Sequence, residues 1–109
     1  MLACDGARIL AAHGDLDGGI LRIGPAIGGL RAVGDTGAAA FAASIQADLL
    51  LRAERPAEAE PVITEALPDA RGDSRQRLAL QLVRTLDLLD RAAEAEAVRR
   101  TYGLADPAQ

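Results

Sequence analysis

The amino-acid sequence predicts an all-α fold, and three observations support this prediction. Helix-forming Ala, Leu, Arg and Glu dominate the chain, whereas aromatic side chains make up only 2% of it. Apolar residues recur at spacings of three and four, which is typical of helices, and strand-like alternation is rare. The chain has 109 residues and is 50% hydrophobic, so we expect one domain with its own core, or a piece of a longer repeat array.

The first two predicted helices lie before residue 34. Apolar residues such as Leu2 and Leu10 predict a helix over Leu2–His13, and Gly14 is expected to end it. Asp15 is expected to cap a second helix, 16–33, which carries Ile20, Ile23, Ile27 and Leu30 at helical spacing. Its glycines and Pro25 oppose helix formation, so we expect a kink near Gly24-Pro25.

The next two predicted helices follow the break at Gly34-Asp35-Thr36. A third helix is expected over Gly37–Ala53, with Asp48 and Arg52 as a favourable i,i+4 pair. Pro56 suits the first position of a fourth helix, which runs to about Leu67 and stops at Pro68. We expect Pro61 to bend this helix slightly. Its glutamates are interpreted as a solvated face: Glu58, Glu60 and Glu65.

The last two predicted helices begin after Gly72. Asp73 and Gln76 resemble a capping box for a fifth helix, from Ser74 to about Leu89. Its apolar stripe is wide enough to contact neighbours on more than one side: Leu78, Leu82, Leu86 and Leu89, broadened by Leu80, Val83 and Leu88. A sixth helix, 92–101, is expected to end at Gly103, and residues 105–109 are expected to fray.

Small and apolar residues repeat along the chain at two constant offsets. Ala59, Ile63 and Ala66 correspond to Gly19, Ile23 and Ala26, 40 residues earlier, and to Ala95, Arg99 and Tyr102, 36 residues later. In the preceding helices Leu10, Leu50 and Leu86 keep the same offsets, as do Ala7, Ala47 and Val83. Because a period of 20 to 50 residues is typical of solenoids, the pattern indicates stacked helix pairs.

This pattern resembles the tetratricopeptide repeat family, in particular the repeat regions of bacterial multidomain transcriptional regulators. The resemblance implies an α-solenoid of antiparallel helix pairs over residues 1–104, with about six helices in three repeats at about 1–35, 36–73 and 74–104. The family's aromatic positions are filled here by Leu, Ile and Ala, and Arg99 and Tyr102 depart from the pattern in the last repeat. These two residues are compatible with a solvated terminal cap.

The residues with catalytic or metal-binding chemistry are few. Cys4 is the one cysteine and His13 the one histidine, so we expect no catalytic site, no metal and no cofactor. His13, Asp15 and Asp17 are better explained as the end and the cap of helices than as a metal site. The glycines of 18–29 lack the Gly-Lys-Ser/Thr that a phosphate loop requires.

Charge and hydropathy limit which partners and which cellular location we expect. The net charge of −4 does not favour nucleic acid as a direct partner. Residues 1–5 do not resemble a signal peptide, and no apolar run approaches the roughly 20 residues of a membrane span, so a cytoplasmic protein without membrane contact is expected.

The resemblance implies that the chain is a non-enzymatic scaffold for a protein or peptide partner, with homo-oligomerisation as a further option. In the family, the first helices of the repeats line a concave groove. The residues that this register places in the groove are Arg8, Phe41, Ser44, Asp48, Arg77, Leu80, Arg84 and Asp87. The arginines among them are suited to carboxylate groups, although ordinary solvated charges are the alternative interpretation.

The alternative function is that of a small helical DNA-binding transcriptional regulator. Its recognition helix would lie around Arg71–Arg84, which is rich in leucine and mixed in charge. A gel shift at low salt distinguishes this function from the scaffold.

Overall fold

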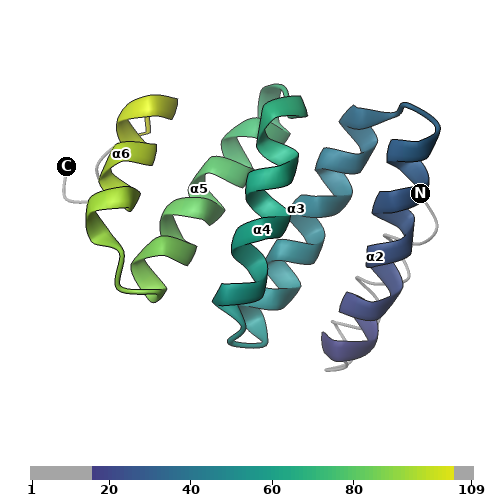
Figure 1. Cartoon of the computed structure of the whole chain (residues 1–109), viewed down its shortest axis with the longest axis horizontal. Helices are drawn as coiled ribbons and strands as arrows, with labels where there is room; N and C mark the ends of the chain where they lie inside the picture. Colours follow the sequence, from purple (N-terminus) through teal and green to yellow (C-terminus); the bar gives the residue numbers. More distant parts are fainter. Residues whose placement is uncertain (1–15, 105–109) are drawn as a thin grey trace.

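The computed structural model describes residues 16–104, and this part of the chain is helical without strands. Figure 1 shows the helices in sequence order: α2 (Leu16–Ala32), α3 (Thr36–Arg52), α4 (Pro56–Ala66), the short 3-10 helix η1 (Leu67–Asp69), α5 (Gly72–Leu88) and α6 (Ala92–Tyr102). The all-α prediction is confirmed for these residues. The predicted first helix, Leu2–His13, the cap Asp15 and the tail 105–109 lie outside the described residues.

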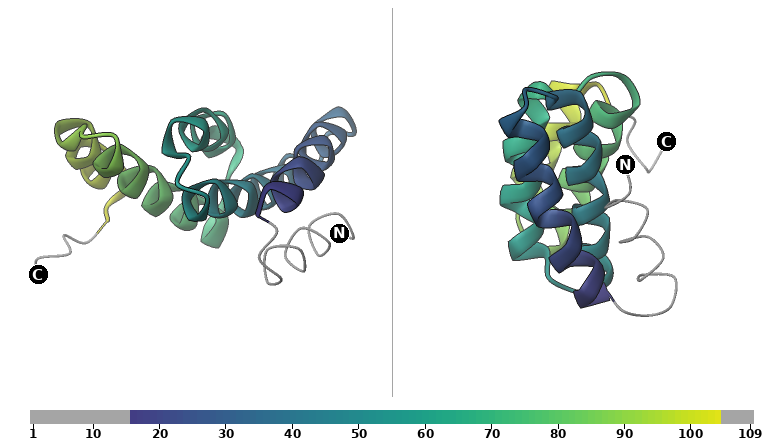
Figure 2. Two further views of the ribbon diagram at one scale, coloured as in Figure 1. Left: turned by 90° about the horizontal axis from the view of Figure 1, so that it is seen from below. Right: turned by 90° about the vertical axis from the view of Figure 1, so that its right-hand side faces the viewer.

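Neighbouring helices pack in a fixed pattern. α2 packs on α3, α3 packs on both α4 and α5, and α5 in turn contacts α4 and α6. Figure 2 shows in its left view that α4 lies on one side of α3 and α5. The opposite side of the contact between α3 and α5 is therefore not covered by α4.

Aliphatic side chains of moderate size form the core. Ile23, Leu49, Ile63 and Leu78 come from four different helices and are fully buried. Alanines fill much of the remaining contact area, above all on α3: Ala39, Ala40, Ala42, Ala43 and Ala47. Because the distance between two helix axes depends on the side chains at the contact, these alanines let the helices around α3 approach closely.

The pair α3 and α4 repeats in α5 and α6 with an offset of 36 residues. The first helix of each pair has 17 residues and the second has 11. The turns also match, because Glu54 and Asp90 both have a φ of 60°. The next amide in each turn donates to an equivalent carbonyl, Arg55 N to Leu50 O at 2.9 Å and Arg91 N to Leu86 O at 2.8 Å. The offset of 36 residues thus appears in the backbone geometry as well as in the sequence.

Several local predictions are confirmed. The break before the third helix is confirmed at Gly34-Asp35, since α3 begins at Thr36; the side chain of Asp35, for which no cap was predicted, accepts from Ala38 N at 3.1 Å. Asp48 and Arg52 form their ion pair at 3.1 Å. Gly103 ends α6 in the left-handed conformation with a φ of 64°, which a residue without a Cβ adopts freely. The glycine-rich helix α2 is continuous and contains Pro25 in its interior; the kink stays a prediction.

One prediction about a helix start is wrong, and one about a helix surface is confirmed only in part. Asp73 does not cap α5, because the helix already begins at Gly72 and its cap residue, Arg71, makes no side-chain capping bond. The glutamates of α4 are a solvated face only in part: Glu58 and Glu65 are exposed as predicted, whereas Glu60 is not. Glu60 pairs with Arg91, and its side chain is only 26% exposed. Glu65 pairs with Arg31 of α2 at 3.6 Å. These contacts between helices involve residues far apart in the sequence, which helical periodicity cannot reveal.

The helix pair α5 and α6 carries polar contacts at the two positions that depart from the repeat pattern. Arg99 contacts Asp87 of α5 at 3.2 Å. The guanidinium of Arg75 lies 4.8 Å from the centre of the Tyr102 ring, a cation–π geometry. These contacts replace the aliphatic packing that Ile63 and Ala66 provide one repeat earlier, and they join α6 to α5.

Candidate protein-binding groove

A groove of about 740 Å³ lies between α3 and α5, on the side that α4 leaves uncovered. Both helices contribute one long face to it, since lining residues recur every three or four positions along each. From α3 these are Ser44, Ile45, Asp48, Leu49, Leu51 and Arg52, and from α5 they are Asp73, Gln76, Arg77, Leu80, Gln81 and Arg84.

The structure brings together five of the residues that the sequence assigned to a groove: Ser44, Asp48, Arg77, Leu80 and Arg84. The other predicted residues lie elsewhere or outside the described part of the chain.

Phe41 is half-buried, packs against the core and does not line this groove. Asp87 also lies away from it and contacts Arg99 of α6 at 3.2 Å. The structure therefore does not bring these two residues into the groove between α3 and α5, and their role in partner binding stays a prediction. Arg8 lies outside the described residues.

Sequence reasoning missed the floor of the groove. Three residues line this floor, although each is at most 6% exposed: Ile45, Leu49 and Leu51. Ile45 and Leu49 are four residues apart in the sequence, a spacing that is typical of the buried face of a helix. Both roles hold here, because a residue at the edge of a helix contact can face the core and the groove at once.

A buried amide connects the two walls. Gln81 Nε2 donates to the backbone oxygen of Ser44 at 2.8 Å. Gln81 Oε1 is buried and has no hydrogen-bond partner among the described residues. The Ser44 hydroxyl donates to Phe41 O at 2.6 Å within α3, which engages its one proton. Ser44 therefore contributes shape to the groove, and Gln81 fixes the spacing between α3 and α5.

The charged side chains of the groove differ in their partners. Arg52 is engaged by Asp48 at 3.1 Å. Arg77 and Arg84 are exposed, and within residues 16–104 neither forms an ion pair. A guanidinium offers several donors in a planar fork that fits carboxylates. These two arginines are thus available to a ligand in the groove.

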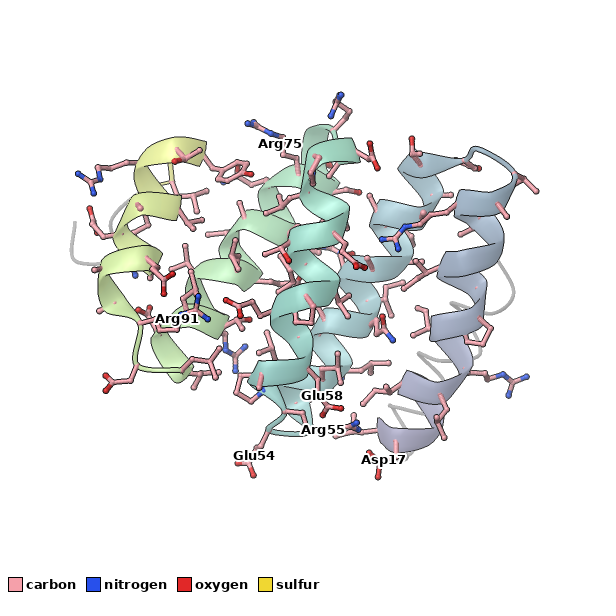
Figure 3. All side chains as sticks on the ribbon, in the orientation of Figure 1. Asp17, Glu54, Arg55, Glu58, Arg75 and Arg91 are labelled. Atoms are coloured by element: carbon pink, nitrogen blue, oxygen red, sulfur yellow. The ribbon has the colours of Figure 1, made fainter. Side chains whose placement is uncertain are left out.

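The ion pairs that shift pKa values lie outside the groove, at the turns within the helix pairs. Figure 3 shows Arg55 beside Asp17 and Glu58. The hydrogen bond from Arg55 lowers the pKa of the Glu58 carboxyl below its ordinary value and raises the pKa of the guanidinium. Arg91 has the same effect on the pKa of Glu94, and also contacts Glu60. Because these shifts arise in structural ion pairs, they do not mark a catalytic site.

The described part of the chain holds no metal-binding constellation. Across residues 16–104, His, Cys, Asp and Glu side chains nowhere gather in threes around a point suited to a metal ion. None of the helices between Leu16 and Tyr102 has both the length and the apolar character to cross a membrane.

Comparison with known proteins adds no family. No protein-family model matches the chain, and neither the curated proteins nor the solved structures give a significant match.

Proposed function

We propose that this chain is a non-enzymatic scaffold of tetratricopeptide-like helix pairs that binds a protein or peptide in the groove between α3 and α5. The observation that carries the proposal is the groove itself, which is open, about 740 Å³ in volume and lined by residues of both helices. Grooves with an apolar floor and a few polar groups on the walls are the usual shape of peptide-binding sites.

The repeat supports the solenoid part of the proposal. In a stack of helix pairs, each first helix contacts its own partner and both helices of the preceding pair. α5 contacts α6, α3 and α4 in this way. The identical helix lengths and the matching turns at an offset of 36 residues agree with such a stack.

The wider setting is part of the same proposal. The repeat pattern resembles the repeat regions of bacterial transcriptional and signalling regulators, so we propose that the chain acts as such a region in the cytoplasm. Homo-oligomerisation is compatible with this function, because an end of a helical stack can receive another copy.

Selection from a random peptide display library tests the proposal. We expect the wild-type protein to enrich peptides that the variant Leu80→Trp binds about tenfold more weakly, because the indole fills the groove. Leu80 is 50% exposed, so the fold tolerates the change. The matched control is Leu21→Trp on α2, where the native side chain is 77% exposed outside the groove. Its affinity for the peptides should equal that of the wild type.

Two results contradict the proposal. If the wild-type protein enriches no peptide, or if Leu80→Trp binds the selected peptides as tightly as Leu21→Trp does, the groove is not a binding site. Tight, salt-sensitive binding of non-specific DNA in a gel shift favours the DNA-binding regulator instead.

A further inference from the structure

We propose that the occupant of the groove is an acidic amphipathic α-helix of the partner, on which one apolar side chain is flanked by two carboxylates seven residues apart. This inference rests on the proposed function and names the chemistry of the partner. It follows from the arrangement of Arg77, Leu80 and Arg84 on α5.

These three residues form one stripe along the groove. Spacings of three and four residues place side chains on the same face of a helix, one turn apart. All three line the groove. Leu80 is 50% exposed, which leaves an apolar surface between two cations. A partner that covers Leu80 with an apolar side chain brings its neighbouring side chains next to both arginines.

The charges of the groove favour a partner with carboxylates. The groove contains three arginines and two aspartates, whereas the whole chain carries a net charge of −4. Asp48 and Arg52 neutralise each other at 3.1 Å. Arg77 and Arg84 have no ion-pair partner within residues 16–104. Two carboxylates of the partner would complete these pairs, and complementary charge of this kind fixes register.

The spacing favours a helical partner over an extended one. Seven residues of α5 span about 10.5 Å, and seven residues of any other α-helix span the same length. A helix can therefore place a carboxylate, an apolar side chain and a second carboxylate opposite the three groove residues in register. In an extended strand, side chains on one face repeat about every 6.6 Å, so the three contacts span about 13 Å and do not match.

Nucleic acid fits the groove less well than such a helix. The phosphates of a nucleic acid form a continuous line of negative charge, and Asp48 and Asp73 would face it across the groove. An acidic helix can place its two carboxylates away from these aspartates. A helix also buries an apolar side chain on Leu80, whereas a phosphate backbone cannot.

Synthetic helical peptides of about 15 residues, long enough for partial helicity in water, test the inference. The glutamate peptide carries two glutamates seven residues apart and a leucine three or four residues after the first. In a scrambled peptide of equal composition the glutamates lie on opposite faces, and in a lysine peptide lysines replace them. We expect wild-type protein to bind the glutamate peptide about tenfold more tightly than either other peptide.

Charge reversal in the protein supplies the decisive comparison. The double variant R77E/R84E should prefer the lysine peptide over the glutamate peptide, because both charges of each pair are exchanged. The matched control R22E/R100E changes the net charge by the same amount on exposed residues outside the groove, and it should keep the wild-type preference. Circular dichroism verifies that both variants fold.

The outcomes separate this inference from the proposed function. If wild-type protein binds the three peptides equally, or if R77E/R84E still prefers the glutamate peptide, the acidic helix is wrong. The groove remains a peptide-binding site in that case if the Leu80→Trp variant binds the library-selected peptides more weakly than the wild-type protein does. If the wild-type protein prefers non-specific DNA to the glutamate peptide, and R77E/R84E abolishes the binding of DNA, the occupant is a nucleic acid.

Discussion

Arg91 and Glu60 are 31 residues apart in the sequence, and their side chains form a hydrogen-bonded ion pair that joins the turn before α6 to α4. The same guanidinium also bonds Glu94 of its own helix. Arg55, 36 residues earlier, makes the equivalent contacts with Glu58 and with Asp17 of α2. An arginine in the turn of each helix pair thus connects that turn to the second helix of the preceding pair.

A double-mutant cycle tests whether this contact couples the helix pairs. We expect Glu60→Gln and Arg91→Gln each to lower the Tm, and the double variant to lower it by less than the sum of both changes. The coupling should weaken in high salt, since charges at the surface are screened. The control for the loss of an arginine side chain is Arg100→Gln on α6, because Arg100 is exposed and forms no ion pair within residues 16–104. Strictly additive effects of both changes would show that the pair does not couple α4 to α6.

Enlarging an alanine between helices should destabilise the protein. Ala59 is fully buried and Ala66 is 3% exposed. Ala59→Leu or Ala66→Leu should reduce the free energy of unfolding by about 1–3 kcal/mol, because a larger side chain has no room in a closely packed interior. Ala57→Leu on the exposed face of α4 is the matched control, and it should stay within about 0.5 kcal/mol.

Glu58→Ala should likewise cost at most about 0.5 kcal/mol at neutral pH, because its ion pair is exposed and contributes little. Urea denaturation measures all four variants. Equal tolerance at the buried and the exposed alanines would contradict the packing of α4.

The buried amide of Gln81 should distinguish polar from apolar substitutions. Gln81→Glu removes the donor to Ser44 O and places a carboxylate at a buried position, so we expect a loss of about 1–3 kcal/mol of stability. Gln81→Met also removes the hydrogen bond, but it eliminates Oε1, the buried oxygen that has no hydrogen-bond partner. Its effect should stay below about 1 kcal/mol. Chemical denaturation at neutral pH measures both. Because both variants lose the hydrogen bond, a larger loss for Met than for Glu would show that an oxygen without a partner at this position does not lower stability.

Replacing the exposed glycines of α2 should stabilise the protein. An added Cβ meets no atom within 4 Å at Gly28 or Gly29. Gly28→Ala and Gly29→Ala should each raise the free energy of unfolding by about 0.5–1 kcal/mol, because alanine restricts the unfolded chain and favours the helix. Gly34→Ala is the control and should destabilise, since Gly34 has a φ of 80°. Thermal unfolding measures the three variants, and a lower Tm for the α2 variants would contradict a helix through Gly29.

Stability should fall in acid because of the two turn glutamates. The hydrogen bonds from Arg55 and Arg91 depress the pKa values of Glu58 and Glu94 below their ordinary value of 4.5 in the folded protein. Their contribution is therefore fully present above about pH 4.5 and is lost as the pH falls through the depressed folded-state values. The raised pKa values of the arginines have no effect in this range. We expect E58Q/E94Q to show a smaller decrease in Tm between pH 6 and pH 3 than wild type, with E65Q as control; an unchanged pH profile would contradict these shifts.

The sequence by itself determined the secondary structure and the repeat. Helical spacing of apolar residues, Pro56 at a helix start and Gly103 at a helix end are local signals, and local signals suffice for elements whose hydrogen bonds close within four residues. The offset of 36 residues was also readable, because equivalent packing positions demand equivalent small side chains, as Ala59 and Ala95 illustrate. Five of the groove residues followed from the same register.

Only the tertiary structure decided which surfaces meet. Glu60 contacts Arg91, so it is not simply solvated as its helix position suggested, and Asp87 contacts Arg99 of α6. Gln81 joins α5 to α3 through a carbonyl 37 residues away. Such contacts depend on the distance and rotation between helices, which are set by the sum of many packed side chains and leave no periodic trace in the sequence.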